Sequence, residues 1–502
     1  MTMTLSHARA IASALTIETR AFIDGAYCAA ADGAVFETVN PATGETVAAV
    51  AHCHGADVER AVAAARRSFD DGAWSRAAPE ARKAVLLRLA ELVRQNAEEL
   101  AVLESLDSGK TITDCLNEIG EEVPTFFQWY AELADKTFGK VAPTGEDALA
   151  VIVKEPAGVV GLVLPWNFPL LMAAWKLAPA LAAGCSCIVK PAEQTPLTAI
   201  RLAALAAEAG VPPGVLNVLP GHGETAGEAI GRHADIDIVS FTGSTEVGGY
   251  FLRYAADSNL KVVGLEMGGK SPFIVLEDAV IDDDLIEHAA MSAFWNGGQN
   301  CSANMRQLVA ASRADEFAER VAARAKSFVV GDPLDPETAI GAMVTREHRD
   351  KVMGYIAKGT GEGARLAAGG NAIGAPGTFI EPTVFTDLTP GMTIAREEIF
   401  GPVLGVLPVR GLAEALSVAR DTAYGLHATV FTRDIDKAIH LARRLPCGTV
   451  AVNGFTEGNV TTPFGGYKRS GSLARDNGAE ALDQYVQTKT IWINVAIPDE
   501  DT

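Results

Sequence analysis

Positive charge is scarce in this chain of 502 residues. It carries 42 lysine and arginine residues against 63 aspartate and glutamate residues, a formal net charge of −21. Nucleic acids and anionic membrane surfaces require a basic face on the protein that binds them. The charge balance therefore predicts neither a nucleic-acid partner nor a membrane partner.

Cysteine is also sparse. The seven cysteines are an odd number scattered along the chain, which does not indicate a disulfide framework. Metal-ligand spacing is missing as well: Cys185 and Cys187 point to opposite faces of a predicted strand, and Cys53-His54 stands alone. We therefore expect a reducing compartment, the cytoplasm, and no structural metal.

Long hydrophobic runs are few. The most apolar window, Leu170 to Val189, has about the length that crosses a membrane. Lys176 and Pro179 lie near its middle, so it divides better into a buried helix and a strand. The segment before Ala12-Ser13-Ala14 is weakly apolar, and we expect no signal peptide.

The chain does have the composition of a globular protein with large cores, with 48% hydrophobic and 21% charged residues. Its length predicts two to four domains. From Gly158 to Leu265, short apolar runs alternate with helical patterns, which predicts an α/β fold with a parallel sheet. Long amphipathic patterns before it predict helices over Ala56 to Asp70, Pro79 to Ser105 and Ile112 to Asp135.

A second α/β region starts near Ser271 and includes a predicted helix, Asp282 to Asn296, that delivers Cys301. Two alternating segments, Leu149 to Glu155 and Lys489 to Val495, are predicted to form a small outlying sheet. Exposed strand edges of this kind often pair across a subunit interface.

Cys301 follows the pair Gly297-Gly298 and precedes small residues. The glycines allow the backbone to bend and to approach a ligand closely. A cysteine becomes a nucleophile only where something activates it, and most single cysteines are small core residues. The stretch by itself leaves both readings open.

Two residues that follow predicted strands could support such a nucleophile. Asn167 is a neutral amide donor that suits a developing oxyanion, although an Asx turn would also explain it. Glu266 lies among apolar and glycine residues, where desolvation would raise its pKa as a general base needs. A structural ion pair is the alternative role for Glu266.

Two further strand ends fit a dinucleotide. Lys190 could hold a ribose hydroxyl or a phosphate, and Glu193 would hold ribose hydroxyls and repel a 2′-phosphate, which favours NAD over NADP. A solvated turn is the alternative. Phe241 to Gly248 predicts a strand, a glycine turn and a helix capped by Ser244, whose free N–H groups favour a pyrophosphate.

Asn167, Lys190, Gly243, Glu266 and Cys301 stand in this order, followed by the motifs Glu398-Ile399-Phe400-Gly401-Pro402 and Pro463-Phe464-Gly465-Gly466. From about Phe22 to Val495 the chain thereby resembles the aldehyde dehydrogenase superfamily. The resemblance implies a Rossmann-like NAD-binding domain (1–138 and 159–270), an α/β catalytic domain (271–475) and oligomerisation strands (139–158 and 476–502). It also implies a homo-oligomer, either a dimer or a dimer of dimers.

The resemblance assigns further roles. A proton relay would involve Lys176 and Asp476, where an aspartate stands in place of the glutamate that family members often have. A monovalent cation is implied near Val39 and Asp107. The cofactor-binding residues would be Leu164, Pro165, Trp166, Lys190, Glu193, Gly223, Phe241, Thr242, Gly243, Ser244, Gly268, Glu398 and Phe400.

The mechanism implied is aldehyde oxidation through a thioester. The Cys301 thiolate would add to the aldehyde, Asn167 and the Cys301 N–H would hold the oxyanion, and hydride would pass to NAD. Glu266 would then activate water. Two alternative functions are a coenzyme-A-acylating enzyme and a non-enzymatic structural protein. The first would transfer the acyl group to a thiol and would not need Glu266. The second would be expected to have lost catalytic residues.

The substrate is suggested by a narrower resemblance, to the gamma-glutamyl-gamma-aminobutyraldehyde dehydrogenases of putrescine catabolism. Ile17 to Arg20, the loop Gly454 to Pro463 and the ending Lys489 to Ile493 carry it. Carboxylates of Glu457 and of a helix with Glu118, Glu121 and Glu122 could receive an ammonium group, or could form a solvated acidic face. Betaine aldehyde and aliphatic aldehydes are the alternatives. The tunnel would be lined by Phe168, Trp175, Trp295, Phe455 and Phe464.

Overall fold

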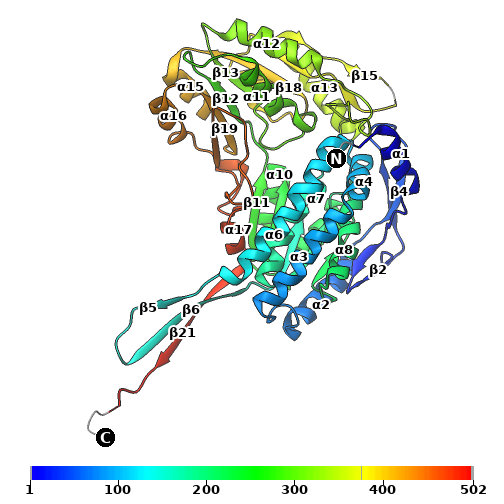
Figure 1. The fold of residues 1–502 in the computed structure, drawn as a ribbon, viewed down its shortest axis with the longest axis vertical. Coiled ribbons are helices and arrows are strands. Elements are labelled where there is room, and N and C mark those ends of the chain that lie inside the picture. Colours follow the sequence, from blue (N-terminus) through cyan, green and yellow to red (C-terminus); the bar gives the residue numbers. More distant parts are fainter. Residues whose placement is uncertain (1–2, 375, 499–502) are drawn as a thin grey trace.

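The computed structural model describes residues 3–374 and 376–498. The predicted segments 1–138 and 476–502 therefore each extend slightly beyond the described residues. Two seven-stranded sheets, each covered by helices, form two lobes (Figure 1). A three-stranded sheet projects from them (Figure 1).

The first sheet has the strand order β11-β10-β7-β8-β9-β1-β2. Its central strands β7 to β11 are parallel, as the alternating pattern predicts, and β1 joins β9 antiparallel. The chain order reverses around β7, and ligands in open α/β sheets bind at the carboxyl ends of the strands at such a point. The strands are β1 (Ala21–Ile23), β2 (Ala26–Cys28), β7 (Val159–Val163), β8 (Ser186–Lys190), β9 (Leu216–Val218), β10 (Ile238–Gly243) and β11 (Val262–Met267).

Helices connect and cover these strands. The apolar window divides as expected into a helix, α7, whose residues are all buried, and the strand β8. Among the described residues, no helix is long and apolar enough to cross a membrane. The helices of this lobe are α1 (Leu5–Ala14), α2 (Gly55–Asp71), α3 (Pro79–Gln95), α4 (Ala97–Ser108), α5 (Ile112–Asn117), α6 (Val123–Leu133), α7 (Pro169–Ala183), α8 (Leu197–Ala209), α9 (Glu228–Arg232) and α10 (Thr245–Ala256), with π-helical turns η1 (Glu118–Glu122) and η3 (Gly223–Gly227).

The single helix predicted over Pro79 to Ser105 is wrong. It is two helices, α3 and α4, that meet at Asn96. The Asn96 side chain donates to the Leu92 carbonyl at 2.7 Å, and its oxygen accepts from Arg201 at 3.2 Å. An asparagine that bonds nearby backbone competes with the helical hydrogen bonds, which explains the break.

The second sheet has the order β14-β17-β18-β13-β12-β19-β20, parallel except at the β14 edge. Its strands are β12 (Pro272–Val275), β13 (Arg306–Ala310), β14 (Arg365–Ala368), β17 (Thr383–Thr386), β18 (Val403–Val409), β19 (His427–Phe431) and β20 (Thr449–Val452). The helices are α11 (Asp283–Phe294), α12 (Ala314–Ser327), α13 (Arg346–Gly361), α14 (Thr393–Arg396), α15 (Gly411–Arg420) and α16 (Ile435–Ala442).

The outlying sheet has the order β21-β6-β5, with β5 (Lys140–Ala142), β6 (Ala148–Pro156) and β21 (Val486–Asn494). The predicted pairing is confirmed: β21 runs antiparallel to β6 from Val486↔Pro156 to Asn494↔Ala148. The segment before β21 forms the short helix α17 (Glu480–Asp483). Smaller elements are β3 (Val35–Val39), β4 (Thr46–Ala51), β15 (Ala372–Ile373), β16 (Phe379–Ile380) and the 3₁₀ turns η2 (Ala134–Lys136), η4 (Trp295–Gly298) and η5 (Lys468–Ser470).

Candidate active site

A cavity of about 520 Å³ opens at the carboxyl ends of β7, β8, β10 and β11 and extends to the loop that holds Cys301. Most of the side chains predicted for the site converge on it from distant parts of the chain. The predicted residues that line it are Leu164, Pro165, Trp166, Asn167, Phe168, Trp175, Lys190, Glu193, Gly223, Phe241, Thr242, Gly243, Ser244, Glu266, Gly268, Trp295, Cys301, Glu398, Phe400, Glu457 and Phe464.

Three predicted substrate residues lie elsewhere. Glu121 and Glu122 are both exposed, and of the two only Glu122 lines the cavity. The chain makes a π-helical turn over Glu118–Glu122, and the wider turn changes which side chain faces inward. Glu118 is buried against Lys110, and the ring of Phe455 packs against His427 at 5.5 Å.

The implied cation-site residues differ in exposure. Val39 is exposed, whereas Asp107 is buried and its Oδ2 accepts from the Leu197 N–H at 3.0 Å. Burial raises the pKa of Asp107 well above its usual range. In the described part of the chain, no group of three or more His, Cys, Asp or Glu could hold a metal ion.

The Cys301 loop depends on an unusual backbone. Helix α11 ends at Phe294, and Asn296, Gly297 and Gly298 then have φ of 51°, 63° and 70°. A Cβ at Gly298 would lie 2.4 Å from the Gly401 carbonyl oxygen. The left-handed backbone conformation of Gly298 and its close contact with Gly401 therefore both require glycine at this position. The turn over Asn296, Gly297 and Gly298 directs the chain back towards the cavity.

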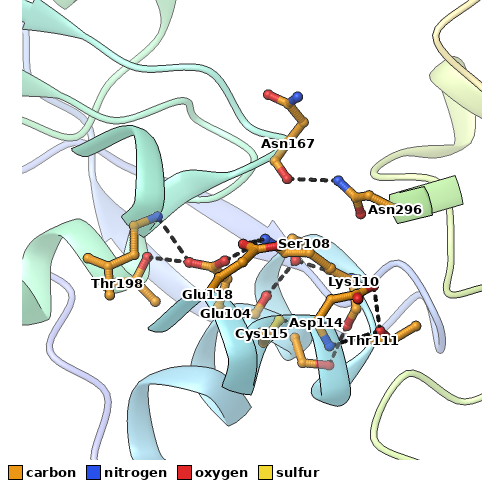
Figure 2. Close-up of polar contacts among 12 residues, drawn as sticks. Glu104, Ser108, Lys110, Thr111, Asp114, Cys115, Glu118, Asn167, Thr198 and Asn296 are labelled. Atoms are coloured by element: carbon orange, nitrogen blue, oxygen red, sulfur yellow. Dashed lines mark hydrogen bonds and ion pairs between the residues drawn. The ribbon is translucent and has the colours of Figure 1, made fainter. Parts of the chain in front are cut away.

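Asn167 is fixed against this loop. Its Nδ2 donates to the Gln299 carbonyl at 2.9 Å, and its own carbonyl accepts from Asn296 Nδ2 at 2.9 Å (Figure 2). An amide nitrogen has two protons, so Nδ2 keeps a second donor for a ligand. Asn167 is 6% exposed, which suits a donor that acts away from bulk water.

Glu266 ends in the same cavity and is 4% exposed. Its Oε1 has no hydrogen-bond partner among the described residues. Burial, and next the Asp476 carboxyl, raise the pKa of Glu266 well above its usual range. Burial and the Glu266 carboxyl likewise raise the pKa of the Cys301 thiol. Burial therefore favours the protonated form of both groups in the resting site.

Lys176 and Asp476 lie behind Glu266, in a small adjoining cavity that all three residues line. Lys176 Nζ donates to Ser240 Oγ at 2.9 Å and lies 3.1 Å from Asp476 Oδ2. Both charged side chains are buried. The predicted pair is thus in contact and adjacent to Glu266.

The strand ends of the first sheet make a polar rim. Lys190 Nζ lies 3.3 Å from Glu193 Oε2. Burial would raise the pKa of Glu193, but Lys190 and hydrogen bonds lower it. Ser244 caps α10 by accepting from the Val247 N–H at 3.2 Å, as predicted. A Cβ at Gly243 would lie 2.5 Å from the Phe241 ring, so a larger residue there would displace the ring.

On the opposite wall, Glu398 Oε1 accepts from the Gly269 N–H at 2.9 Å. A Cβ at Gly268 would lie 2.1 Å from the Glu398 oxygens, so a larger residue there would displace this carboxyl. Burial raises the pKa of Glu398 to about 7. The Phe400 ring meets Trp166 edge-on at 5.2 Å.

His348 and Lys351 are among the cavity residues that were not predicted from the sequence. His348 Nε2 lies 2.6 Å from the Phe400 carbonyl oxygen, and burial lowers its pKa to about 4. A neutral His348 can therefore donate this hydrogen bond and hold Phe400 in place. Both residues lie on α13, and the sequence pattern gave no sign of that helix.

Glu457 belongs to a loop far along the chain from Cys301, but its side chain contacts the Cys301 loop. Its Oε1 accepts from Asn300 Nδ2 at 2.8 Å and also from the Ser302 hydroxyl. These are the residues on either side of Cys301. Burial raises the pKa of Glu457, although the two hydrogen bonds oppose the effect.

Known proteins are similar to this chain in sequence and in structure along nearly its whole length. Aminoacetaldehyde dehydrogenase of Pseudomonas aeruginosa is 50% identical over 97% of this chain and 98% of its own. An indole-3-acetaldehyde dehydrogenase of P. syringae, solved with NAD+, matches with a TM-score of 0.97 and 47% identity over 98% of this chain and 100% of its own. A gamma-glutamyl-gamma-aminobutyraldehyde dehydrogenase from Burkholderia cenocepacia matches with a TM-score of 0.96 and 48% identity over the same shares. The sequence model of the aldehyde dehydrogenase family matches residues 27–491, and this chain belongs to that family.

Proposed function

We propose that the chain oxidises an aminoaldehyde to the carboxylic acid with NAD, through a thioester on Cys301. One observation carries the proposal: a thiol, an amide donor and a buried carboxyl lie in one cavity beside a polar rim, and Oε1 of that carboxyl has no hydrogen-bond partner in the part of the chain that the structure describes. Family membership supplies the reaction class, and these three side chains supply its parts.

The residues of the rim and of the opposite wall fit NAD. The N-terminus of α10, capped by Ser244, offers free N–H groups to a pyrophosphate. Glu193 and Glu398 are the carboxyls that would hold ribose hydroxyls, and the Glu193 carboxylate would repel a 2′-phosphate, which favours NAD over NADP. The Trp166–Phe400 pair would border the nicotinamide. Bound NAD supplies the hydride acceptor for the oxidation.

The chain's own residues then divide the remaining steps. The Cys301 thiol gives its proton to solvent water in the open cavity as its sulfur bonds to the carbonyl carbon. The carbonyl oxygen, which gains the negative charge, accepts a hydrogen bond from Asn167 Nδ2. After oxidation, Glu266, once it has passed its own proton onward and is ionised, takes a proton from water, whose oxygen bonds to the acyl carbon. The C–S bond breaks, and the acid leaves. Lys176 and Asp476 would pass the proton onward from Glu266.

Two acidic side chains in the cavity, Glu457 and Glu122, support an amine substrate. Glu457 is held by residues on both sides of Cys301, so an ammonium group that it binds lies near the reacting carbon. This arrangement fits a short aminoaldehyde best. The gamma-glutamyl derivative of 4-aminobutanal, betaine aldehyde and simple aliphatic aldehydes are the alternatives.

A panel of aldehydes tests the substrate proposal. We expect kcat/KM to be higher for 4-aminobutanal than for its gamma-glutamyl derivative, betaine aldehyde or hexanal. Glu457→Gln keeps the hydrogen-bond acceptor but removes the charge, and should lower kcat/KM for 4-aminobutanal about tenfold while sparing hexanal. Glu319→Gln, on the exposed face of α12, is the matched control. Best activity on hexanal, or an equal loss for both substrates in Glu457→Gln, would contradict the amine proposal.

The remaining sequence-based predictions are proposals as well. We propose that residues 1–138 and 159–270 form the NAD-binding domain and 271–475 the catalytic domain, with 139–158 and 476–502 in oligomerisation. A monovalent cation near Val39 and Asp107 is also proposed. A cytoplasmic location accords with seven free cysteines among the described residues.

A further inference from the structure

A buried cluster of charged side chains lies beside the loop of Asn167 and Phe168, and no step of the proposed mechanism uses it. Lys110 Nζ lies 2.8 Å from Glu104 Oε1 and also pairs with Glu118 (Figure 2). The exposed fractions of the three side chains are 1%, 0% and 2%. Burying charges is costly even when they are paired, so the cluster calls for an explanation.

The cluster holds the Asn167 loop at two points. Glu104 Oε2 accepts from the N–H of Leu170, in the first turn of α7, at 3.0 Å. Lys110 Nζ lies 4.7 Å from the centre of the Phe168 ring, where an ammonium is attracted to the aromatic face. Thr198 Oγ1 donates to the same Glu104 oxygen at 3.4 Å.

Protonation in the cluster favours this arrangement. Burial would lower the pKa of Lys110, but Glu104 and Glu118 together raise it, so the ammonium keeps its charge. Burial raises the pKa of Glu118, and the Lys110 ammonium opposes this shift. The ammonium therefore stays charged beneath the Phe168 ring.

We propose that Glu104 and Lys110 are positioning residues that hold Asn167 and Phe168 in place for the reaction. The inference rests on the role proposed for Asn167. A donor stabilises a developing oxyanion only if it is aligned beforehand, and a displacement of about 1 Å can cost roughly a hundredfold in rate. Neither Glu104 nor Lys110 lines the cavity, so both would act through the loop.

The test measures the burst of NADH in the first turnover of the full-length enzyme. Glu104→Gln keeps an oxygen for the Leu170 N–H but removes the charge that holds Lys110. Lys110→Met removes the ammonium and keeps the apolar stem. We expect the burst rate to fall about tenfold in each, with KM little changed. The rate at which iodoacetamide alkylates Cys301 should stay within about twofold of the parental rate, because neither substitution removes a hydrogen bond of the Cys301 loop.

A double-mutant cycle distinguishes positioning from general stability. In an Asn167→Ala background, Glu104→Gln should cause little further loss, because residues that act through one another are not additive. Glu99→Gln is the matched control, since Glu99 is on the same helix but pairs with Arg201 near the surface, at 2.8 Å. It should keep the parental burst rate.

If Glu104→Gln lowers the burst rate as much in the Asn167→Ala background as in the parent, the positioning role is overturned. A parental burst rate in Lys110→Met would overturn it as well, and this variant serves as the test if Glu104→Gln does not fold. A parental rate in Asn167→Ala itself would instead refute the proposed oxyanion role, and the inference with it. The cycle therefore separates the two failures.

Discussion

At the scale of single residues, the cavity contains several carboxyls whose pKa is raised. Burial raises the pKa of Glu266, Glu398 and Glu457, all of which line it. A buried carboxyl that keeps its proton avoids the cost of an isolated charge. It can release the proton when a ligand brings a cation or hydrogen-bond donors, so ligand binding in this site is coupled to pH.

Glu398 offers the clearest case, because its pKa is raised to about 7. If ribose hydroxyls donate to its ionised form, NAD binding should weaken as the pH falls below about 7, by up to tenfold per pH unit. Calorimetric titration with NAD between pH 5.5 and 8.5 measures this. The dependence should vanish in Glu398→Gln, and an NAD affinity in the parent that is flat across this range would contradict the proposed contact.

The sequence alone predicts most residues of the site but not the contacts between them. Cys301, Glu266 and Asn167 were predicted from residue type, neighbours and resemblance, and they do share one cavity. That Glu457 would hold both neighbours of Cys301 was not predictable, since these contacts join residues 155 and 157 positions apart. They depend on how the loop after β20 folds back over the cavity.

At the scale of elements, the turn between α11 and Cys301 is the most constrained segment. Gly298→Ala would place a Cβ 2.4 Å from the Gly401 carbonyl oxygen at a φ of 70°. We expect a loss of stability of about 1–3 kcal/mol and a large loss of kcat, because the loop that presents the thiol must shift. Thermal unfolding and steady-state kinetics measure the two effects.

Gly249→Ala is the control for this substitution. Gly249 is inside α10, and a Cβ there would meet nothing within 4 Å. Alanine favours a helix over glycine, so this variant should be neutral or slightly more stable. Parental activity and stability in Gly298→Ala would show that the turn is not constrained as described.

Helices were predicted best where their apolar stripe is strong. The predicted helix Ala56 to Asp70 lies within one residue of the bounds of α2 (Gly55–Asp71), whose inner face is buried. Helix α13 was missed because it contains Gly354 and Gly359 and buries little beyond Val352 and Ile356. The π-helical turn at Glu118–Glu122 was also missed, since periodicity assumes regular helical spacing.

At the scale of the whole molecule, the projecting sheet leaves β21 as an edge strand (Figure 1). Its exposed apolar residues include Ile491 (42%), Trp492 (60%) and Ile493 (44%). Edge strands of this kind tend to pair with another chain. We therefore propose that this sheet joins subunits, in a dimer or a dimer of dimers.

The double variant Ile491→Glu/Ile493→Glu should halve the mass of the assembly, because charges on the edge strand oppose apolar contact. Sedimentation velocity measures this directly. Lys489→Gln, which alters the same strand without removing apolar surface, is the control and should keep the parental mass. A parent that sediments as a monomer, or a double variant of unchanged mass, would contradict an interface on this strand.

The measurement closest to the central claim is mass spectrometry of the Glu266→Gln enzyme after a single turnover. Without its base, the enzyme should release one equivalent of NADH per active site and then stall. The peptide that contains Cys301 should carry the acyl group, and Cys301→Ala should give neither burst nor adduct. Steady turnover by Glu266→Gln, or a stalled enzyme with no acyl group on Cys301, would contradict the thioester mechanism.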